Sequence, residues 1–103
     1  IIMKPISGYD DCIVQDEQKS NVFVYWDGYS VARCTFEDNA THKMYVDNFI
    51  VRSPIRGRGF GRQMIKRIRS AFPHAHIVIE TFESSRPFWV KMQSEGFINE
   101  IAN

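Results

Sequence analysis

Cysteine is scarce in this sequence, and histidine shows no spacing that could complete a metal site. The two cysteines, Cys12 and Cys34, form no CxxC motif. Disulfide scaffolds and zinc domains both need closely spaced cysteines, so neither is expected, and both residues are interpreted as reduced thiols. His42, His74 and His76 are interpreted as surface residues, and no metal cofactor is expected.

Long hydrophobic runs are also missing. No apolar run approaches the ~18 to 20 residues of a membrane span, and the start has no basic region followed by an apolar stretch of the signal-peptide type. We therefore expect a soluble cytoplasmic protein without a membrane partner. Ile1 and Ile2 precede Met3, which leaves open whether they are native and whether the chain is part of a longer protein.

The composition is that of one globular domain. The sequence has 103 residues, of which 44% are apolar, and it includes eight Phe, four Tyr and two Trp. This is enough apolar surface for one packed core and too little chain for a second. Residues 1–103 are therefore expected to form a single domain with one functional site.

Positive charge is concentrated in one segment, although the net charge is only +1. No acidic residue lies between Asp47 and Glu80. Seven of the thirteen lysines and arginines fall there: Arg52, Arg56, Arg58, Arg62, Lys66, Arg67 and Arg69. Such a segment is typical of a site for a polyanion, either a phosphorylated small molecule or a nucleic-acid backbone. A solvated helix face is the alternative.

The first half of the sequence predicts three strands. Residues 22–26 and 29–36 are rich in β-branched and aromatic residues, and Asp27-Gly28 between them favours a type I′ turn of two residues, so an antiparallel hairpin is expected. A third strand is expected over residues 43–52. Alternation along it would place four side chains on one face: Tyr45, Asp47, Phe49 and Val51.

After the third strand the apolar period changes to that of a helix. Apolar residues recur at three- and four-residue spacing from Phe60 to Phe72, and Pro73 ends the pattern. Residues 77–79 then predict a short buried strand, parallel to the strand that precedes the helix.

A second helix and a last strand complete the prediction. Ser84 or Ser85 can cap the helix, and Gly96 ends it. Phe97-Ile98 would begin the last strand. The expected fold class is α/β (α+β), with a mixed, mostly antiparallel central sheet flanked by two helices.

The loop Arg56-Gly57-Arg58-Gly59-Phe60-Gly61 stands between the third strand and the first helix. A helix N-terminus and several backbone N–H groups meet there. The glycines let an anion approach the main chain, and the arginines add charge. The pattern predicts a site that fits a pyrophosphate.

Other kinds of glycine-rich loop match less well. A Walker A loop needs Lys-Ser/Thr after its last glycine, where this chain has Arg62-Gln63. The dinucleotide fingerprint needs GxGxxG, where this chain has GxGxG. A glycine turn without a ligand is the remaining alternative.

The pattern Arg56-x-x-Gly59-x-Gly61 resembles the acetyl-CoA-binding signature R/Q-x-x-G-x-G/A of the GNAT acetyltransferases. The surrounding elements follow in the family's order, so the resemblance covers about Val22 to Ile98. It implies the GNAT-like acyl-CoA N-acyltransferase fold with a reduced N-terminal part, because only about twenty residues precede the first clear strand. It also implies acetyl-CoA as co-substrate and an amine as acceptor.

The resemblance implies site residues as well. Backbone groups of the third strand would bind the pantetheine arm, and amides of the loop would hold the pyrophosphate, with an arginine beside them and a tryptophan at the border of the groove. In chain order these are Phe49, Ile50, Val51, Arg56, Gly57, Arg58, Gly59, Phe60, Gly61, Arg62 and Trp89. Many members place a tyrosine that protonates the leaving thiolate four residues before the helix-ending glycine. That position is Met92 here, which cannot donate a proton, and an alignment to Trp89 would offer only an indole N–H.

Two carboxylates are candidate catalytic groups. A lysine-type amine has a pKa near ~10.4 and needs a base at pH 7. Asp47 is the first candidate, because in this family its strand lines the acyl end of the cofactor; pairing with an arginine is the alternative role. Glu80 could hold a water or contact the acceptor. A main-chain N–H at the end of the strand would polarise the thioester oxygen.

The predicted function is N-acetylation of an amine by direct transfer from acetyl-CoA. The acceptor stays open between small amines, lysine side chains and protein N-termini, and the short front half favours a peptide or protein. A non-catalytic CoA-binding or interaction module is the second interpretation. Nucleic-acid binding ranks lowest, because no aromatic stacking platform is identified. An exposed sheet edge would allow a homodimer.

Overall fold

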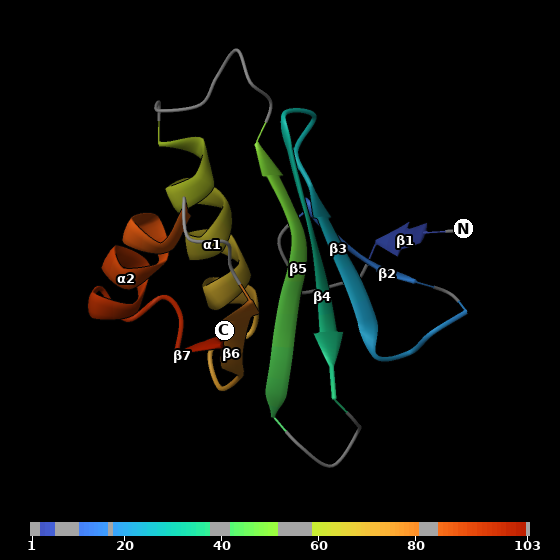
Figure 1. Ribbon diagram of the computed structural model, residues 1–103. Coiled ribbons are helices and arrows are strands. Elements are labelled where there is room, and N and C mark those ends of the chain that lie inside the picture. Colours follow the sequence, from blue (N-terminus) through green and yellow to red (C-terminus); the bar gives the residue numbers. More distant parts are fainter. Residues whose placement is uncertain are drawn as a thin grey trace.

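The structure is a computed structural model that describes residues 3–5, 11–16, 18–37, 42–51, 59–80 and 85–102, with only the backbone for residues 3–5. Within these ranges the chain forms seven strands and two helices (Figure 1). In chain order they are β1 Met3–Pro5, β2 Ile13–Asp16, β3 Val22–Trp26, β4 Ser30–Phe36, β5 Lys43–Val51, α1 Phe60–Ala71, β6 His76–Glu80, α2 Arg86–Ser94 and β7 Glu100–Ala102. Neither helix of this described part is long and apolar enough to span a membrane.

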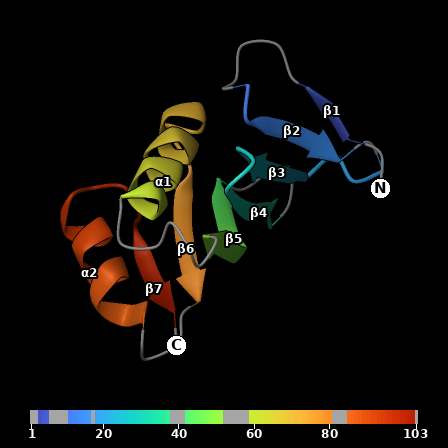
Figure 2. The same cartoon turned by 90° about the horizontal axis from the view of Figure 1, so that it is seen from above.

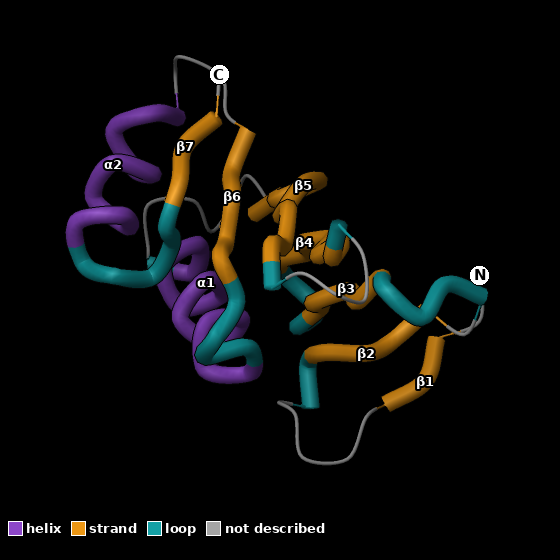
Figure 3. Tube along the Cα trace, turned by 90° about the horizontal axis from the view of Figure 1, so that it is seen from below, coloured by secondary structure: helices purple, strands orange, loops and turns teal. Residues whose placement is uncertain are grey.

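The strands form one sheet in the order of the sequence, from β1 to β7. Neighbours from β1 to β5 are antiparallel, whereas β5, β6 and β7 are parallel. Both helices lie on the same side of the sheet, which we call the helix face; the opposite side is the outer face (Figures 2 and 3). The predicted fold class, a mixed and mostly antiparallel sheet flanked by two helices, is confirmed.

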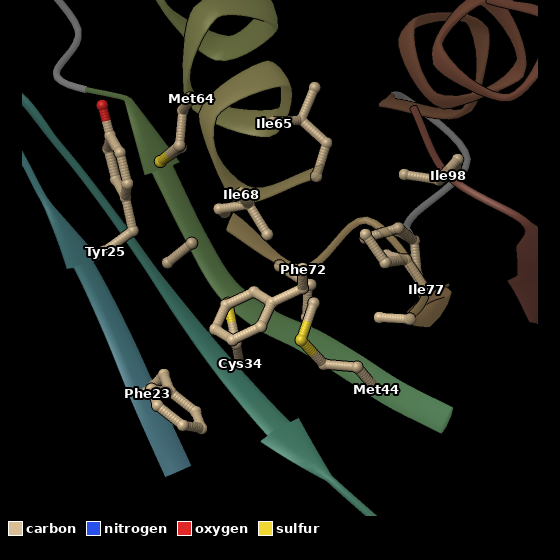
Figure 4. Close-up of a cluster of buried hydrophobic side chains, with 14 of the residues drawn as sticks. Phe23, Tyr25, Cys34, Met44, Met64, Ile65, Ile68, Phe72, Ile77 and Ile98 are labelled. Atoms are coloured by element: carbon tan, nitrogen blue, oxygen red, sulfur yellow. The ribbon is translucent and has the colours of Figure 1, made fainter. Parts of the chain in front are cut away.

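The core lies between the helices and the sheet (Figure 4). The periodic apolar residues of α1 supply Met64, Ile65 and Ile68, all fully buried, as the spacing predicted. Trp89 and Met92 of α2 are buried in the same cluster. Helix packing therefore depends on the two apolar stripes that the sequence shows.

Two strands at the N-terminal end were not predicted. β1 and β2 pair antiparallel ahead of the hairpin, and Ile13 of β2 is buried in the core. With three and four residues, these strands are too short to show a clear alternation of apolar side chains. The prediction of a first clear strand at Val22 was therefore wrong.

The last strand begins later than predicted. β7 starts at Glu100, whereas Phe97-Ile98 was expected to begin it. Asn99 explains the delay, because its Oδ1 accepts a hydrogen bond from Ile77 N at 2.8 Å and ties the preceding turn to β6. Gly96 does end α2, with φ 84°, as predicted.

The hairpin turn is longer than the predicted type I′ turn. β3 ends at Trp26 and β4 begins at Ser30, so three residues separate the strands. Asp27 does not adopt the positive φ that a type I′ turn requires; in this turn only Gly28 does, with φ 90°. Instead, Asp27 Oδ1 accepts hydrogen bonds from Tyr29 N at 2.8 Å and Ser30 N at 2.7 Å, which stabilises the longer turn.

A bulge in β5 was also not predicted. Asn48 has φ 49°, and the pairing with β4 slips between the Arg33–Asp47 and Val31–Ile50 partners. Asparagine tolerates this left-handed conformation better than most residues. The extra residue reverses the alternation of side chains along the rest of the strand.

The bulge changes which side chains share a face. Phe49 lies on the helix face, where its ring contacts Trp89 at 4.6 Å between centroids, and Val51 packs against the core with it. Tyr45 and Asp47 lie on the outer face, since the residues that alternate with them, such as buried Val46, face the helices. The prediction that Tyr45, Asp47, Phe49 and Val51 share one face was wrong.

Arg69 of α1 connects this helix to the segments that precede β6 and β7. Its guanidinium donates to the carbonyl oxygen of Ala75 at 2.7 Å, to that of Phe97 at 3.2 Å and to Asn99 Oδ1 at 2.6 Å. Arg69→Met should lower the free energy of unfolding by about 2 kcal/mol, because partly buried acceptors lose a charged donor. Urea unfolding measures this, with the exposed Lys66→Met as control. Equal unfolding midpoints for both variants would contradict the assignment.

Cys34 is expected to be chemically inert in the folded protein. Burial raises the pKa of its thiol to about 12, and the charge of Asp47 acts in the same direction. Iodoacetamide at pH 8 should therefore modify the half-buried Cys12 first and Cys34 only after unfolding, because the thiolate is the reactive form. Since the folded state keeps this proton longer, stability should also fall as the pH rises from about 9 towards 12. Rapid native labelling of Cys34, seen by peptide mass spectrometry, would contradict this.

Candidate functional site

A cavity of about 1100 Å³ opens where β5 separates from β6, beneath the first turn of α1 and beside α2. It is the site of most of the predicted functional residues. Its lining consists of residues 46–51, 59–62, Ile79, Glu80, Ser85, Phe88, Trp89, Lys91, Met92 and Ala102.

Ten of the thirteen residues predicted for the site line this cavity: Asp47, Phe49, Ile50, Val51, Gly59, Phe60, Gly61, Arg62, Glu80 and Trp89. The other three, Arg56, Gly57 and Arg58, lie outside the described residues. Segments that are distant in the sequence thus meet at one place. Whether these residues bind a cofactor or act in catalysis stays a prediction.

The cavity exists because two parallel strands diverge. β5 and β6 are paired from Lys43–His76 to Val46–Ile79, and within the described residues no pair follows. From Asp47 to Ile50, β5 therefore turns one backbone edge towards the cavity rather than towards a strand. The bulge at Asn48 lies within this part of the strand. A backbone edge of this kind can bind the amide groups of an extended ligand.

Aromatic rings form the apolar wall of the cavity. Phe49 of β5 contacts Trp89 at 4.6 Å, and Phe88 contacts Trp89 at 4.8 Å between ring centroids. Gly61 in the first turn of α1 completes the wall, since a Cβ there would lie 3.3 Å from Cζ of Phe88. A bare glycine thus keeps helix and ring close together.

The amino end of α1 is open towards the cavity. Gly59 is its N-cap residue, with φ 82°, and no side chain caps the helix. The first turn also has no acidic residue. Backbone N–H groups and the positive end of the helix dipole are therefore available at the cavity, which is the arrangement that binds phosphate groups at helix N-termini.

Arg62 has a structural role besides its place at the cavity. Its guanidinium lies 2.5 Å from Oε1 of Glu95, which holds the start of α1 against the end of α2. The same guanidinium stacks over the ring of Phe97 at 5.7 Å. Because its side chain is 44% exposed, it can still contact a ligand, but it would share its charge with Glu95.

Several lining residues were missed by the sequence analysis. Lys91 of α2 adds a positive charge to the wall, and Asn48 and Ser85 add polar side chains. No motif marks them, because they stand on a helix face, at a bulge and at a helix start that only the folded chain brings together. Lys91 stands three residues after Phe88, so it lies on the same face of α2, and a helix with an assigned cavity face would have indicated it.

The tip of the β3–β4 hairpin supports the first turn of α1. The ring of Tyr29 lies 5.7 Å from that of Phe60. Below it, the hydroxyl of the buried Tyr25 donates to Asp27 Oδ2 at 2.8 Å and accepts from Arg67 at 3.2 Å. Burial, followed by the bond to Asp27, raises the pKa of Tyr25, so this phenol stays protonated and the support is permanent at neutral pH.

No tyrosine lines the cavity within the part of the chain that the structure describes. Met92, which stands at the position where the family pattern often has tyrosine, is buried in the core and borders the cavity. Trp89, the other aligned candidate, is also buried. Neither side chain can act as a proton donor at neutral pH.

Two carboxylates stand at the opening instead. Asp47 and Glu80 each follow the last paired residues of their strands, Val46 and Ile79, so they occupy neighbouring positions in the parallel register. Both side chains are exposed and both line the cavity. Arg33 is the partner of Asp47 in β4. The opening therefore places two exposed carboxylates side by side at the edge of the cavity.

Comparison with known proteins agrees with this geometry. The model of the Acetyltransferase (GNAT) family matches residues 4–92. No curated protein and no solved structure gave a significant match. The match includes β5, α1, β6 and most of α2, whose residues line most of the cavity.

Proposed function

Because the chain belongs to the GNAT acetyltransferase family, we propose that it transfers the acetyl group of acetyl-CoA to an amine. The observation that carries the proposal is the cavity, which joins an uncapped helix N-terminus, a strand edge and two carboxylates. Acetyl-CoA has an anionic head, an extended amide arm and a reacting thioester. These three parts need the three features in this order. This fit supports acetyl-CoA as the donor and direct transfer as the reaction.

The chain's own residues would divide the binding of acetyl-CoA among them. Amides of Gly61 and Arg62 at the start of α1 would bind the pyrophosphate, assisted by Lys91 and by the loop that contains Arg56, Gly57 and Arg58. The edge of β5 from Asp47 to Ile50 would bind the pantetheine amides. The rings of Phe49, Phe88 and Trp89 would cover the apolar part of the arm.

The reaction needs a neutral amine next to the thioester carbonyl. Asp47 would accept a proton from the incoming ammonium group, directly or through one water, and Glu80 would hold that water or the acceptor. The nitrogen then attacks the carbonyl carbon, the amide bond forms, and the C–S bond breaks. A main-chain N–H of β5 would stabilise the oxygen that becomes negative. As the amide forms, the nitrogen loses its second proton to water. The sulfur leaves as a thiolate and takes one proton back from water, so the step balances.

A second candidate is a non-catalytic module that binds CoA in the same cavity. The observation that favours it is Met92, buried where many members of the family have a proton-donating tyrosine. This module would keep the helix N-terminus and the strand edge but would not transfer the acetyl group. The two candidates therefore differ in turnover and agree in binding.

The test is a transfer assay with a panel of amines: a polyamine, an arylalkylamine, lysine-containing peptides and peptides with a free N-terminus. Release of the CoA thiol is followed by colour, and the acetylated product is confirmed by mass spectrometry. The proposal expects an acetylated product from at least one class, in equal amount to the released thiol. Tight CoA binding without any product would replace it by the non-catalytic module.

A further inference from the structure

The outer face of the sheet carries an apolar row beside the cavity. Trp26 of β3 is the register partner of Val31 of β4, and Val31 is the partner of Ile50 of β5. Partners in a sheet share a face, so the three side chains lie next to one another across three strands. Trp26 is 64% exposed and Ile50 is 52% exposed. Since both helices cover the other side (Figure 2), neither of them shields this row.

The β5 bulge places Ile50 in the row. Without the extra residue, Ile50 would alternate in phase with Met44 and Val46 and would face the helices. The bulge turns Ile50 outwards, so that its apolar side chain is exposed to water. Together with Trp26 and Val31, Ile50 forms a contiguous apolar patch on the outer face, and such patches mark interaction sites.

The row is continuous with the proposed site of transfer. Ile50 and Asp47 both line the cavity and both lie on the outer face. They are three positions apart on β5, which is at most about 10 Å at about 3.3 Å per residue. An acceptor whose amine reaches Asp47 from the outer face would therefore extend over Ile50, Val31 and Trp26.

The charges at the opening favour a cation on this side. Asp47 and Glu80 face the opening, and Arg33 opposite Asp47 offsets one of the two negative charges. In contrast, α1 on the helix face carries arginines and a lysine and no acidic residue. The anionic co-substrate and the cationic acceptor are thus attracted to opposite sides of the sheet.

We infer that the acceptor is a lysine side chain in a peptide with an apolar residue next to the lysine, and that Trp26, Val31 and Ile50 select it. This inference rests on the proposed acetyl transfer and adds the substrate class. The four-carbon stem of a lysine together with one residue of extended peptide spans the distance from Asp47 to the row. The apolar neighbour then covers the exposed surface of Trp26.

The kinetic test uses two lysine peptides that differ at one position, with phenylalanine or glycine beside the lysine. For the wild type, kcat/KM should be about tenfold higher with phenylalanine. Trp26→Ser combined with Val31→Thr should remove this preference and leave kcat/KM for the glycine peptide unchanged. Val90→Ser, which alters a 47% exposed apolar residue of α2, is the matched control and should keep the preference. Equal rates for both peptides, or a preference that survives in the double variant, would overturn the inference.

A binding test separates this inference from the proposed function. Trp89 is only 4% exposed, so acrylamide quenching of fluorescence reports mainly Trp26. The phenylalanine peptide should protect Trp26, and the glycine peptide should not. If no amine of the panel is acetylated, the proposed function fails, and protection of Trp26 alone decides whether the row binds this peptide. If a small amine is acetylated and no peptide is, the proposed function holds and this inference fails. Protection of Trp26 that rises with protein concentration in the absence of peptide would overturn the inference in favour of a second copy of the chain. A higher kcat/KM for a phenylalkylamine than for the peptide would overturn it in favour of a small amine.

Discussion

Asp47→Asn is expected to lower kcat/KM for acetyl transfer by about a hundredfold at pH 7. The substitution keeps the size of the side chain and removes its ability to accept a proton. Because Asp47 is exposed at the cavity opening, the fold should stay intact and acetyl-CoA should bind as before. Steady-state rates between pH 6 and pH 9 measure the effect. The deficit should shrink as the pH rises, since more of the amine is then neutral without help.

Glu100→Gln is the control for this prediction. Glu100 is an exposed carboxylate on β7 that does not line the cavity, so its removal should leave the rate unchanged. Glu80→Gln gives the remaining comparison, with an expected loss smaller than that of Asp47→Asn. If Asp47→Asn has the wild-type rate and Glu80→Gln loses it, the roles of the two carboxylates are exchanged.

The second large effect is expected for Gly59→Asp, which should raise the dissociation constant of acetyl-CoA by about thirtyfold. The substitution places a negative charge at the open N-terminus of α1, where the pyrophosphate is proposed to bind. A repulsion of about 2 kcal/mol corresponds to this factor. Isothermal titration measures it, and the difference should decrease with added salt.

Gly59→Asn is the matched control, because it has the same shape without the charge. Asparagine and aspartate both tolerate the left-handed conformation of Gly59, which has φ 82°. A Cβ at this position meets no atom within 4 Å. The asparagine variant should therefore fold and bind nearly as the wild type does. Equal affinity of the two variants would place the phosphates elsewhere.

Hydrophobic periodicity predicted the elements that carry long, regular patterns. Residues 60–72 gave α1, and the run at residues 77–79 gave β6, because burial on one stripe or one strand leaves a clear record in the sequence. β1 and β2 show no such pattern in the sequence, since three or four residues are too few for one. The hairpin turn failed for another reason, because Asp27 accepts main-chain hydrogen bonds that favour a longer turn.

The bulge at Asn48 explains what periodicity could not show about the site. One extra residue reverses the alternation, so that Phe49 faces the helices and Ile50 faces outwards. A pattern of alternating residues cannot reveal where the alternation breaks. The glycine loop, in contrast, was visible as a motif, and the family match to residues 4–92 agrees with the interpretation made from it. Lys91 had no such mark and became a candidate only when α2 was placed beside the cavity.

The most direct test of the central claim is hydrogen–deuterium exchange of the wild-type protein with and without acetyl-CoA. Bound acetyl-CoA should slow exchange at the backbone amides of residues 47–50 and 60–63, where the strand edge and the start of α1 line the cavity. Exchange in β2 and β3, outside the cavity, should not change. Protection confined to other elements, or none at saturating acetyl-CoA, would contradict the claim that this cavity binds the acetyl donor.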